Sequence, residues 1–130
     1  MIWAHSLGYA FFVMINAYRG FKIFLAMKMR LHPEPFERIK SGEKNIECRL
    51  NDEKRRSLNV GDVVVFENRG GGETLERTVT ALHMFSDFES MFEQFPEERI
   101  NDVCQYYTPE EEKECGVVAI ELPVSRLFFA

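Results

Sequence analysis

The chain has 130 residues and a formal net charge of −5, which fits a single folded domain and argues against a protein that binds nucleic acid over its whole surface. The charge is uneven along the chain. Residues 27–60 hold nine basic and six acidic side chains, a local charge of +3, whereas residues 61–130 hold five basic and fifteen acidic ones, a local charge of −10. The positive segment suggests either a local phosphate contact or a plain solvated stripe.

The cysteines and histidines give no pattern of a disulfide framework or of a metal site. Cys48, Cys104 and Cys115 are an odd number without a C-x-x-C pair, which favours a reducing cytoplasm. The histidines, at positions 5, 32 and 83, are too widely spaced to form a ligand motif. We therefore predict a cytoplasmic protein that uses no metal and no cofactor.

The first 26 residues differ in kind from the rest. They are apolar and aromatic and contain no Asp or Glu, and the uncharged run Met1 to Tyr18 is about the minimum length of a membrane span. Three interpretations stay open: a membrane or signal-anchor segment, an extra packed helix, and a non-native extension upstream of the true start. We prefer the third because Met27 or Met29 would begin a clean strand, so membrane association is expected only if residues 1–26 are native.

From residue 27 onward the pattern predicts short strands and helices. Alternating or continuous apolar runs indicate the strands, while capping boxes, first-turn prolines and closing glycines mark the helices. In order, these are a strand over 27–31, a helix from the prolines at 33 and 35 to the glycine at 42, a strand over 44–50, a loop or helical turn over 51–57, a strand over 63–66, a hairpin loop over 70–72, a returning strand over 75–85, helices that begin at capping boxes over 86–89 and 108–111, and a last strand over 117–122.

About five strands without room for regular βαβ crossovers predict an α+β fold, a small mixed β-barrel with flanking short helices. The domain organisation is then an extension of residues 1–26, a domain of residues 27–123, and a tail of residues 124–130.

Several segments of this domain resemble the signature of the ASCH domain family. They are residues 31–36 (LHPEPF), 39–44 (IKSGEK), 46–52 (IECRLND) and 60–62 (VGD). ASCH domains are similar to the PUA domains of RNA-modifying proteins. The resemblance therefore implies a PUA-like barrel with RNA or a nucleotide bound in a cleft beside it, and it covers about residues 27–122.

Some bacterial members of the family resemble amidohydrolases that remove acyl groups from the exocyclic amine of cytidine derivatives. Those enzymes use a Lys in a G-x-K motif, a Thr three residues later, and a downstream Glu. Here the Lys is Lys44, and Glu47 stands at the Thr position, so the hydroxyl nucleophile is missing. Glu89 and Glu93 are the nearest candidates for the downstream Glu.

Three charged residues around the second predicted strand form the candidate catalytic centre, with Lys44 and Glu47 as the catalytic pair. Lys44, Glu47 and Arg49 together can hold an anion or polarise a carbonyl group. Arg49 would favour a neutral, basic Lys44, or Glu47 would activate a water molecule. The bland alternative is a surface ion pair of Glu47 with Arg49, worth only ~0–1 kcal/mol.

Ligand-binding residues are predicted on the strand end and the turn after it. They are Arg49, Asn51, Asp52, Lys54, Arg55 and Arg56. Arginine suits phosphate contacts, and phosphate neutralisation makes binding depend on salt. Tyr106 and Tyr107 either stack on a base or pack half-buried.

Three functional hypotheses follow, and whether the protein is an enzyme stays open. The first is an RNA- or nucleotide-binding module. The second is a small amidohydrolase that acts on N4-acylated cytidine-type nucleosides. The third is an accessory domain that binds a protein partner through its acidic half.

Overall fold

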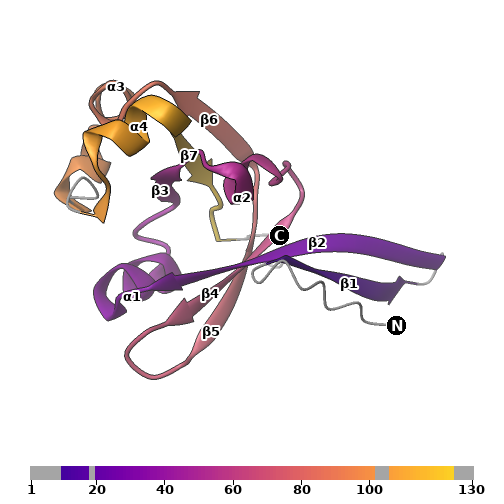
Figure 1. The fold of residues 1–130 in the computed structure, drawn as a ribbon. Coiled ribbons are helices and arrows are strands. Elements are labelled where there is room, and N and C mark those ends of the chain that lie inside the picture. Colours follow the sequence, from indigo (N-terminus) through magenta and orange to yellow (C-terminus); the bar gives the residue numbers. More distant parts are fainter. Residues whose placement is uncertain (1–9, 18–19, 102–105, 125–130) are drawn as a thin grey trace.

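The computed structural model describes residues 10–17, 20–101 and 106–124 of the chain (Figure 1). The elements in chain order are β1 (Ala10–Ala17), β2 (Gly20–Leu31), α1 (Pro33–Ser41), β3 (Ile46–Leu50), α2 (Glu53–Arg56), β4 (Val63–Asn68), β5 (Thr74–Thr78), β6 (Ala81–Phe85), α3 (Phe88–Gln94), the 3-10 helix η1 (Pro96–Asn101), α4 (Pro109–Cys115) and β7 (Val117–Glu121). The predicted α+β class is confirmed.

The strands form two sheets. The larger has the order β1-β2-β4-β5, and the smaller has the order β3-β7-β6. Strands β2 and β4 run parallel, while every other pair of neighbours is antiparallel. The β1–β2 hairpin reaches away from the body of the molecule, and α3 and α4 lie beside the smaller sheet (Figure 1).

The predicted barrel is corrected, because the described strands form two open sheets and no ladder joins them. The pairing of β1 with β2 stops at Met27, so the last residues of β2 have no strand on that side within the described chain. Two cationic side chains occupy this edge instead. Arg49 Nη2 donates to the carbonyl oxygen of Arg30, and Lys54 Nζ donates to that of Lys28, each at 3.1 Å. These side-chain donors satisfy the carbonyl groups of β2 that a further strand would bind if the sheet closed into a barrel.

The single returning strand predicted over residues 75–85 is also wrong. The chain changes sheets at Val79 and Thr80, so that β5 belongs to the larger sheet and β6 to the smaller. The Val79 amide still donates to the carbonyl oxygen of Asp62, beside the larger sheet. The next amide, that of Thr80, donates to Glu121 at the end of β7. An apolar pattern shows that both segments are extended but not that they pair with different neighbours.

The extension contains strands, which contradicts the packed helix among the three interpretations. Residues 10–17 and 20–26 pair as an antiparallel hairpin, while residues 1–9 and 18–19 lie outside the described residues. No helix in the described ranges is long and apolar enough to cross a membrane. The division at residue 26 and the non-native origin of the extension stay predictions, and so does the tail, of which residues 125–130 are not described.

The smaller sheet lies between two apolar clusters, because successive side chains of a strand point to opposite faces. On β7, Val118 and Ile120 join the cluster against β2, β4 and α1, whereas Val117 and Ala119 join the cluster against α3. On β3, the three apolar residues predicted to share a face all enter the α3 cluster; they are Ile46, Cys48 and Leu50. The alternate side chains, at positions 47 and 49, therefore face the larger sheet.

The helix ends follow the sequence with one change. Gly42 ends α1 in the left-handed conformation, with φ of 86°, and Thr108 and Glu111 form the reciprocal capping box of α4. The N-cap of α3 is Asp87 rather than Ser86, since the Asp87 carboxylate accepts from the amide of Ser90.

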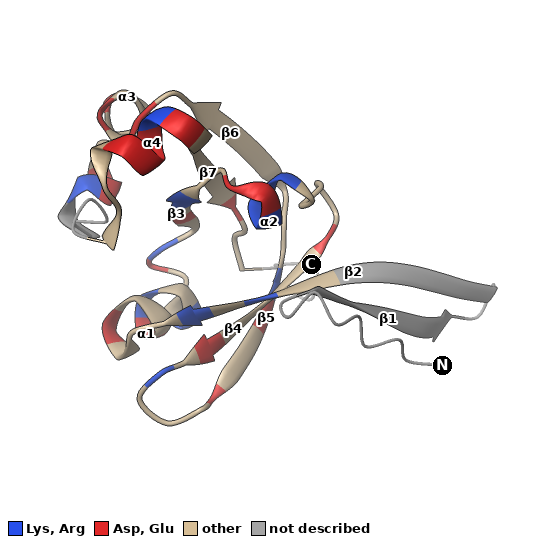
Figure 2. Cartoon of the chain, viewed as in Figure 1, with Lys and Arg blue, Asp and Glu red and all other residues tan. Residues whose placement is uncertain are grey.

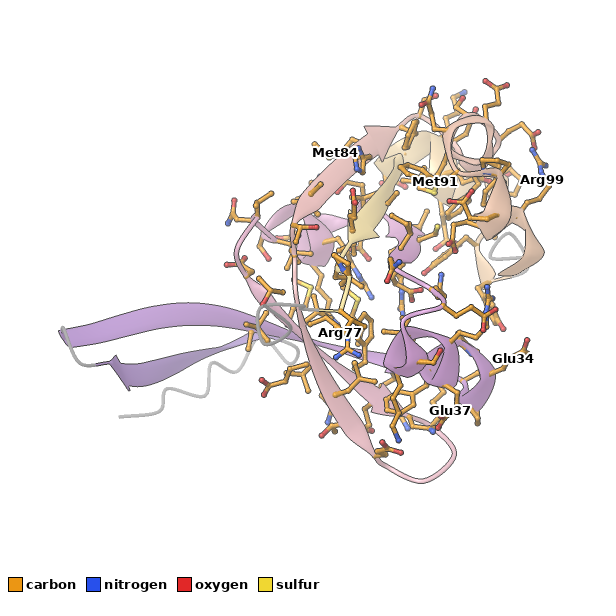
Figure 3. The ribbon with its side chains drawn as sticks, turned by 180° about the vertical axis from the view of Figure 1, so that it is seen from behind. Glu34, Glu37, Arg77, Met84, Met91 and Arg99 are labelled. Atoms are coloured by element: carbon orange, nitrogen blue, oxygen red, sulfur yellow. The ribbon has the colours of Figure 1, made fainter. Side chains whose placement is uncertain are left out.

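Arg77 extends from β5 to the end of α1 (Figure 3), where its Nη2 donates to two terminal carbonyl groups.

Candidate functional site

Lys44 is the buried centre of the charged segment. It precedes β3, which begins at Ile46 rather than at residue 44 as predicted, and its side chain is 2% exposed. Its Nζ donates to the carbonyl oxygen of Ile46 and to Glu98 Oε2, the latter at 2.6 Å, and lies 3.6 Å from Glu47 Oε1. An ammonium group has three hydrogens, and three acceptors surround this one. Lys44 thus serves as a fixed cation between two carboxylates.

Glu98 is the partner that the sequence did not reveal. It lies on η1, 54 residues from Lys44, and is 3% exposed. The candidates named from the sequence do not reach this position, because Glu89 and Glu93 are exposed and Glu89 pairs with Arg99 at 2.9 Å. Local periodicity in the segment after Pro96 does not distinguish the buried Glu98 from an exposed glutamate, so the sequence could not predict it.

Glu47 and Arg49 form a charge-assisted pair on the face of β3 that looks toward the larger sheet. Glu47 Oε2 accepts from Nε of Arg49 at 2.9 Å and lies 2.9 Å from its Nη2. The interpretation as a surface pair is wrong, since the two side chains are only 8% and 16% exposed. Burial lowers the pKa of Arg49, but the charge of Glu47 and the hydrogen bonds to Glu47 and Tyr107 outweigh this effect and raise it overall. The predicted triple of Lys44, Glu47 and Arg49 is therefore one connected network.

A second group of charges shares Arg49 with this network and holds two further cations. We call Arg49, Lys54 and Arg55 the cationic cluster. Burial, followed by the charges of Arg55 and Arg49, lowers the pKa of Lys54 to about 8. Burial and the charge of Arg49 lower the pKa of Arg55 as well. Burial is the largest cause of both shifts, and the like charges of neighbouring cations add to it.

Arg55 has one donor to spare within this cluster. Its Nη1 pairs with Asp52 Oδ2 at 3.1 Å, whereas its buried Nε has no hydrogen-bond partner among the described residues. A buried donor without an acceptor costs free energy, which an incoming acceptor recovers. Asp52 also caps α2 by accepting from the amide of Arg55, and its predicted ligand-binding role stays a prediction.

The other two predicted ligand-binding residues are not in the cationic cluster. Arg56 is exposed, and its Nε donates to the carbonyl oxygen of Asn51 at 2.8 Å. The Asn51 amide in turn donates to Gly116, which attaches the start of α2 to the end of α4. On the ribbon coloured by charge, α2 is mixed in sign while α4 is mainly acidic (Figure 2).

The two neighbouring tyrosines differ in environment. Tyr107 is half-buried and stacks on Phe88 with ring centroids 5.7 Å apart, as expected of packing. Tyr106 is 55% exposed and stacks on His32, with centroids 5.9 Å apart and ring planes 26° apart. Only Tyr106 of the two presents an open ring.

Neither thiol chemistry nor a metal cluster is evident in the part of the chain that the structure describes. Burial raises the pKa of Cys48 to about 12, so the reactive thiolate is scarce at neutral pH. No three His, Cys, Asp or Glu side chains gather there as a metal ion would require.

The fold and site together define a mixed α+β domain with two open sheets and a G-x-K-x-x-E-x-R segment, residues 42–49, that runs from the end of α1 into β3 and buries Lys44 and Glu47. The family model described as "ASCH domain" matches residues 29–125, so the chain belongs to the ASCH domain family, as the resemblance predicted.

Two solved structures support this assignment. The crystal structure of hypothetical protein PH0355 has a TM-score of 0.66 at 39% sequence identity, covering 76% of this chain and 99% of that one. The solution NMR structure of protein PF0455 from Pyrococcus furiosus has a TM-score of 0.60 at 38% identity, covering 75% of this chain and 96% of that one. Comparison with curated proteins found no match.

Proposed function

We propose that this ASCH domain binds RNA or a nucleotide by a phosphate group held at the cationic cluster of Arg49, Lys54 and Arg55. The observation that carries the proposal is that Arg49 and Lys54 meet at the edge of β2 beyond Met27, with Arg55 close enough to act on the charge of Lys54 and its buried Nε without a hydrogen-bond partner among the described residues. A phosphate oxygen supplies both the negative charge and the acceptor.

Burial favours the cluster over other cations of the positive segment. Lys28 and Arg30, on β2, share the one carboxylate of Glu67 at 2.5 and 3.4 Å and are exposed. In the cationic cluster, by contrast, burial is the largest cause that lowers the pKa of Lys54 and of Arg55. Partial burial strengthens the attraction of such a group for an anion, because fewer water molecules screen it.

The test is the salt dependence of binding to a single-stranded RNA oligonucleotide, measured by filter binding between 50 and 200 mM salt. We expect Arg55→Ala to weaken binding by about tenfold and to reduce the slope of log affinity against log salt by about 0.7, the value for one phosphate contact on a single strand.

Arg56→Ala is the matched control, because it removes the same charge from the same helix but outside the cluster. It should change affinity and slope much less than Arg55→Ala. Binding that is insensitive to salt, or equal losses in the two variants, would refute the proposal.

A second candidate function is amide hydrolysis on N4-acylated cytidines, and the Lys44–Glu98 contact favours it. This contact supplies a Lys and a downstream Glu like those of the catalytic relatives, with Glu47 where they have Thr. The donors of Lys44 are all engaged, so Glu47 would be the base that activates water. Lys44 would orient the carboxylate of Glu47.

A screen of N4-acylated cytidines for release of cytidine tests this second function. We expect Glu47→Gln to reduce turnover by at least about 100-fold, the usual contribution of a general base, while RNA binding persists. No release from any of these substrates, or equal release by Glu47→Gln, would exclude it.

A further inference from the structure

We propose that the exposed rings of His32 and Tyr106 form a stacking surface for an unpaired base next to the cationic cluster, so that the ligand is single-stranded RNA. This inference rests on the proposed function and specifies its ligand. The rings stack with centroids 5.9 Å apart and planes 26° apart, although the two residues are 74 positions apart in the chain.

The exposure of Tyr106 is unusual for the aromatic residues of this domain. Phe36, Phe66 and Phe88 are completely buried, and Tyr107 stacks on the face of Phe88. Among the described residues, the exposed large hydrophobic side chains are Val60, Met84 and Tyr106, of which only Tyr106 is aromatic. An open ring held by a second ring offers a flat apolar face at little entropic cost, which is what base stacking uses.

Each ring of the pair is tied to the cationic cluster through a neighbouring residue. His32 follows the end of β2 and lies two residues from Arg30, whose carbonyl oxygen accepts from Arg49. Two residues of extended chain span only about 7 Å. Tyr106 precedes Tyr107, whose side chain makes a hydrogen bond with that of Arg49. The ring pair and the phosphate-binding cations are thus adjacent, as the base and phosphate of one nucleotide are.

The arrangement discriminates between forms of RNA. Bases in a duplex are stacked on one another and paired, so an aromatic pair at the protein surface cannot reach their faces. A single strand can turn one base outward onto His32 and Tyr106 while its phosphate meets Arg49, Lys54 and Arg55. Duplex RNA would use the charges alone.

The test uses two probes of equal length, a single-stranded octaadenylate and the corresponding abasic ribose-phosphate oligomer, at one salt concentration. Tyr106→Ala should weaken octaadenylate binding by about 5- to 150-fold, the range for loss of one stacked base, and leave binding of the abasic oligomer unchanged. Tyr106→Phe should restore octaadenylate binding, because the ring without its hydroxyl still stacks. His32→Ala should reproduce part of the loss.

Arg55→Ala separates this inference from the proposed function, since it should weaken both probes alike. If wild-type protein binds the two probes equally and Tyr106→Ala changes neither, the stacking surface is refuted while phosphate binding survives. If wild-type protein binds neither probe, both the inference and the function on which it rests are refuted. Circular dichroism of the variants establishes that each is folded, as expected for changes at exposed rings.

Discussion

Replacing Lys44 by Ala is expected to lower the free energy of unfolding by about 3–5 kcal/mol, the usual cost of removing one partner from a buried ion pair. The substitution takes away the ammonium 2.6 Å from Glu98 and 3.6 Å from Glu47, and both carboxylates stay in a region that is almost inaccessible to water. The carbonyl oxygen of Ile46 loses a donor at the same time. Urea denaturation at pH 7 measures the change.

Two further variants show whether the loss comes from buried charge. Lys44→Met combined with Glu98→Leu removes the closest pair while Glu47 keeps Arg49 as its partner, and it should recover much of the stability, because apolar replacements of similar volume avoid the desolvation cost. Lys40→Ala is the matched control: Lys40 pairs with Glu73 at 2.6 Å, but both side chains are about half exposed, so little change is expected. Equal destabilisation by Lys44→Ala and Lys40→Ala would contradict the buried network.

This expected instability affects how activity measurements on Lys44 are interpreted. A Lys44→Ala protein that is partly unfolded loses turnover and binding whether or not Lys44 takes part in chemistry. Glu47→Gln keeps the shape of the side chain, so it is the better probe of catalysis. Its activity should be compared with that of Lys44→Ala only after correction for the folded fraction.

Local patterns in the sequence predicted the elements that depend on neighbouring residues. The alternation over residues 46–50 predicted which side chains of β3 enter the core, and the Thr108 capping box and Gly42 predicted helix ends. These features are local because strand faces and helix caps are set by residues within a few positions of one another. The motif around Lys44 likewise predicted a family that the comparisons confirm.

Contacts between distant segments were beyond these patterns. Lys44 meets Glu98, and His32 meets Tyr106, only because η1 and the segment before α4 fold back on the first half of the domain. The open sheets have a similar origin, since a strand pattern does not specify its partner strand. The edge of β2 could be covered by another strand or, as observed, by the side chains of Arg49 and Lys54. The strand pattern alone does not decide between the two.

RNA binding is expected to weaken by roughly tenfold between pH 7 and pH 9.5, because the pKa of Lys54 in the unliganded protein is about 8. Below pH 8 the ammonium is present and attracts phosphate. Above pH 8 the side chain is mainly neutral, so a bound phosphate must recruit a proton, and the affinity falls as pH rises. Binding to octaadenylate across this range at constant ionic strength measures the effect.

Lys54→Arg is the control for this assignment, since a guanidinium keeps its charge throughout the range. The variant should bind at pH 9.5 nearly as well as at pH 7. If its affinity declines in parallel with that of the wild type, another group is responsible for the pH dependence.

The same shift makes an independent prediction about stability. In the unfolded chain Lys54 keeps its proton up to its ordinary pKa of 10.5, whereas in the folded protein it loses it near pH 8. Between these values the unfolded state binds more protons, so the contribution of Lys54 to stability rises with pH from about 8 to 10.5 and is unfavourable below that window.

Lys54→Met should therefore stabilise the protein at pH 7 and abolish this rise, while it weakens RNA binding at pH 7. Lys54 would then lower the stability of the protein at the pH at which it is charged and raise the affinity for RNA at the same pH. Its contact with a phosphate group explains why such a residue is present. Loss of both stability and binding in Lys54→Met would instead assign Lys54 a packing role beside Lys28.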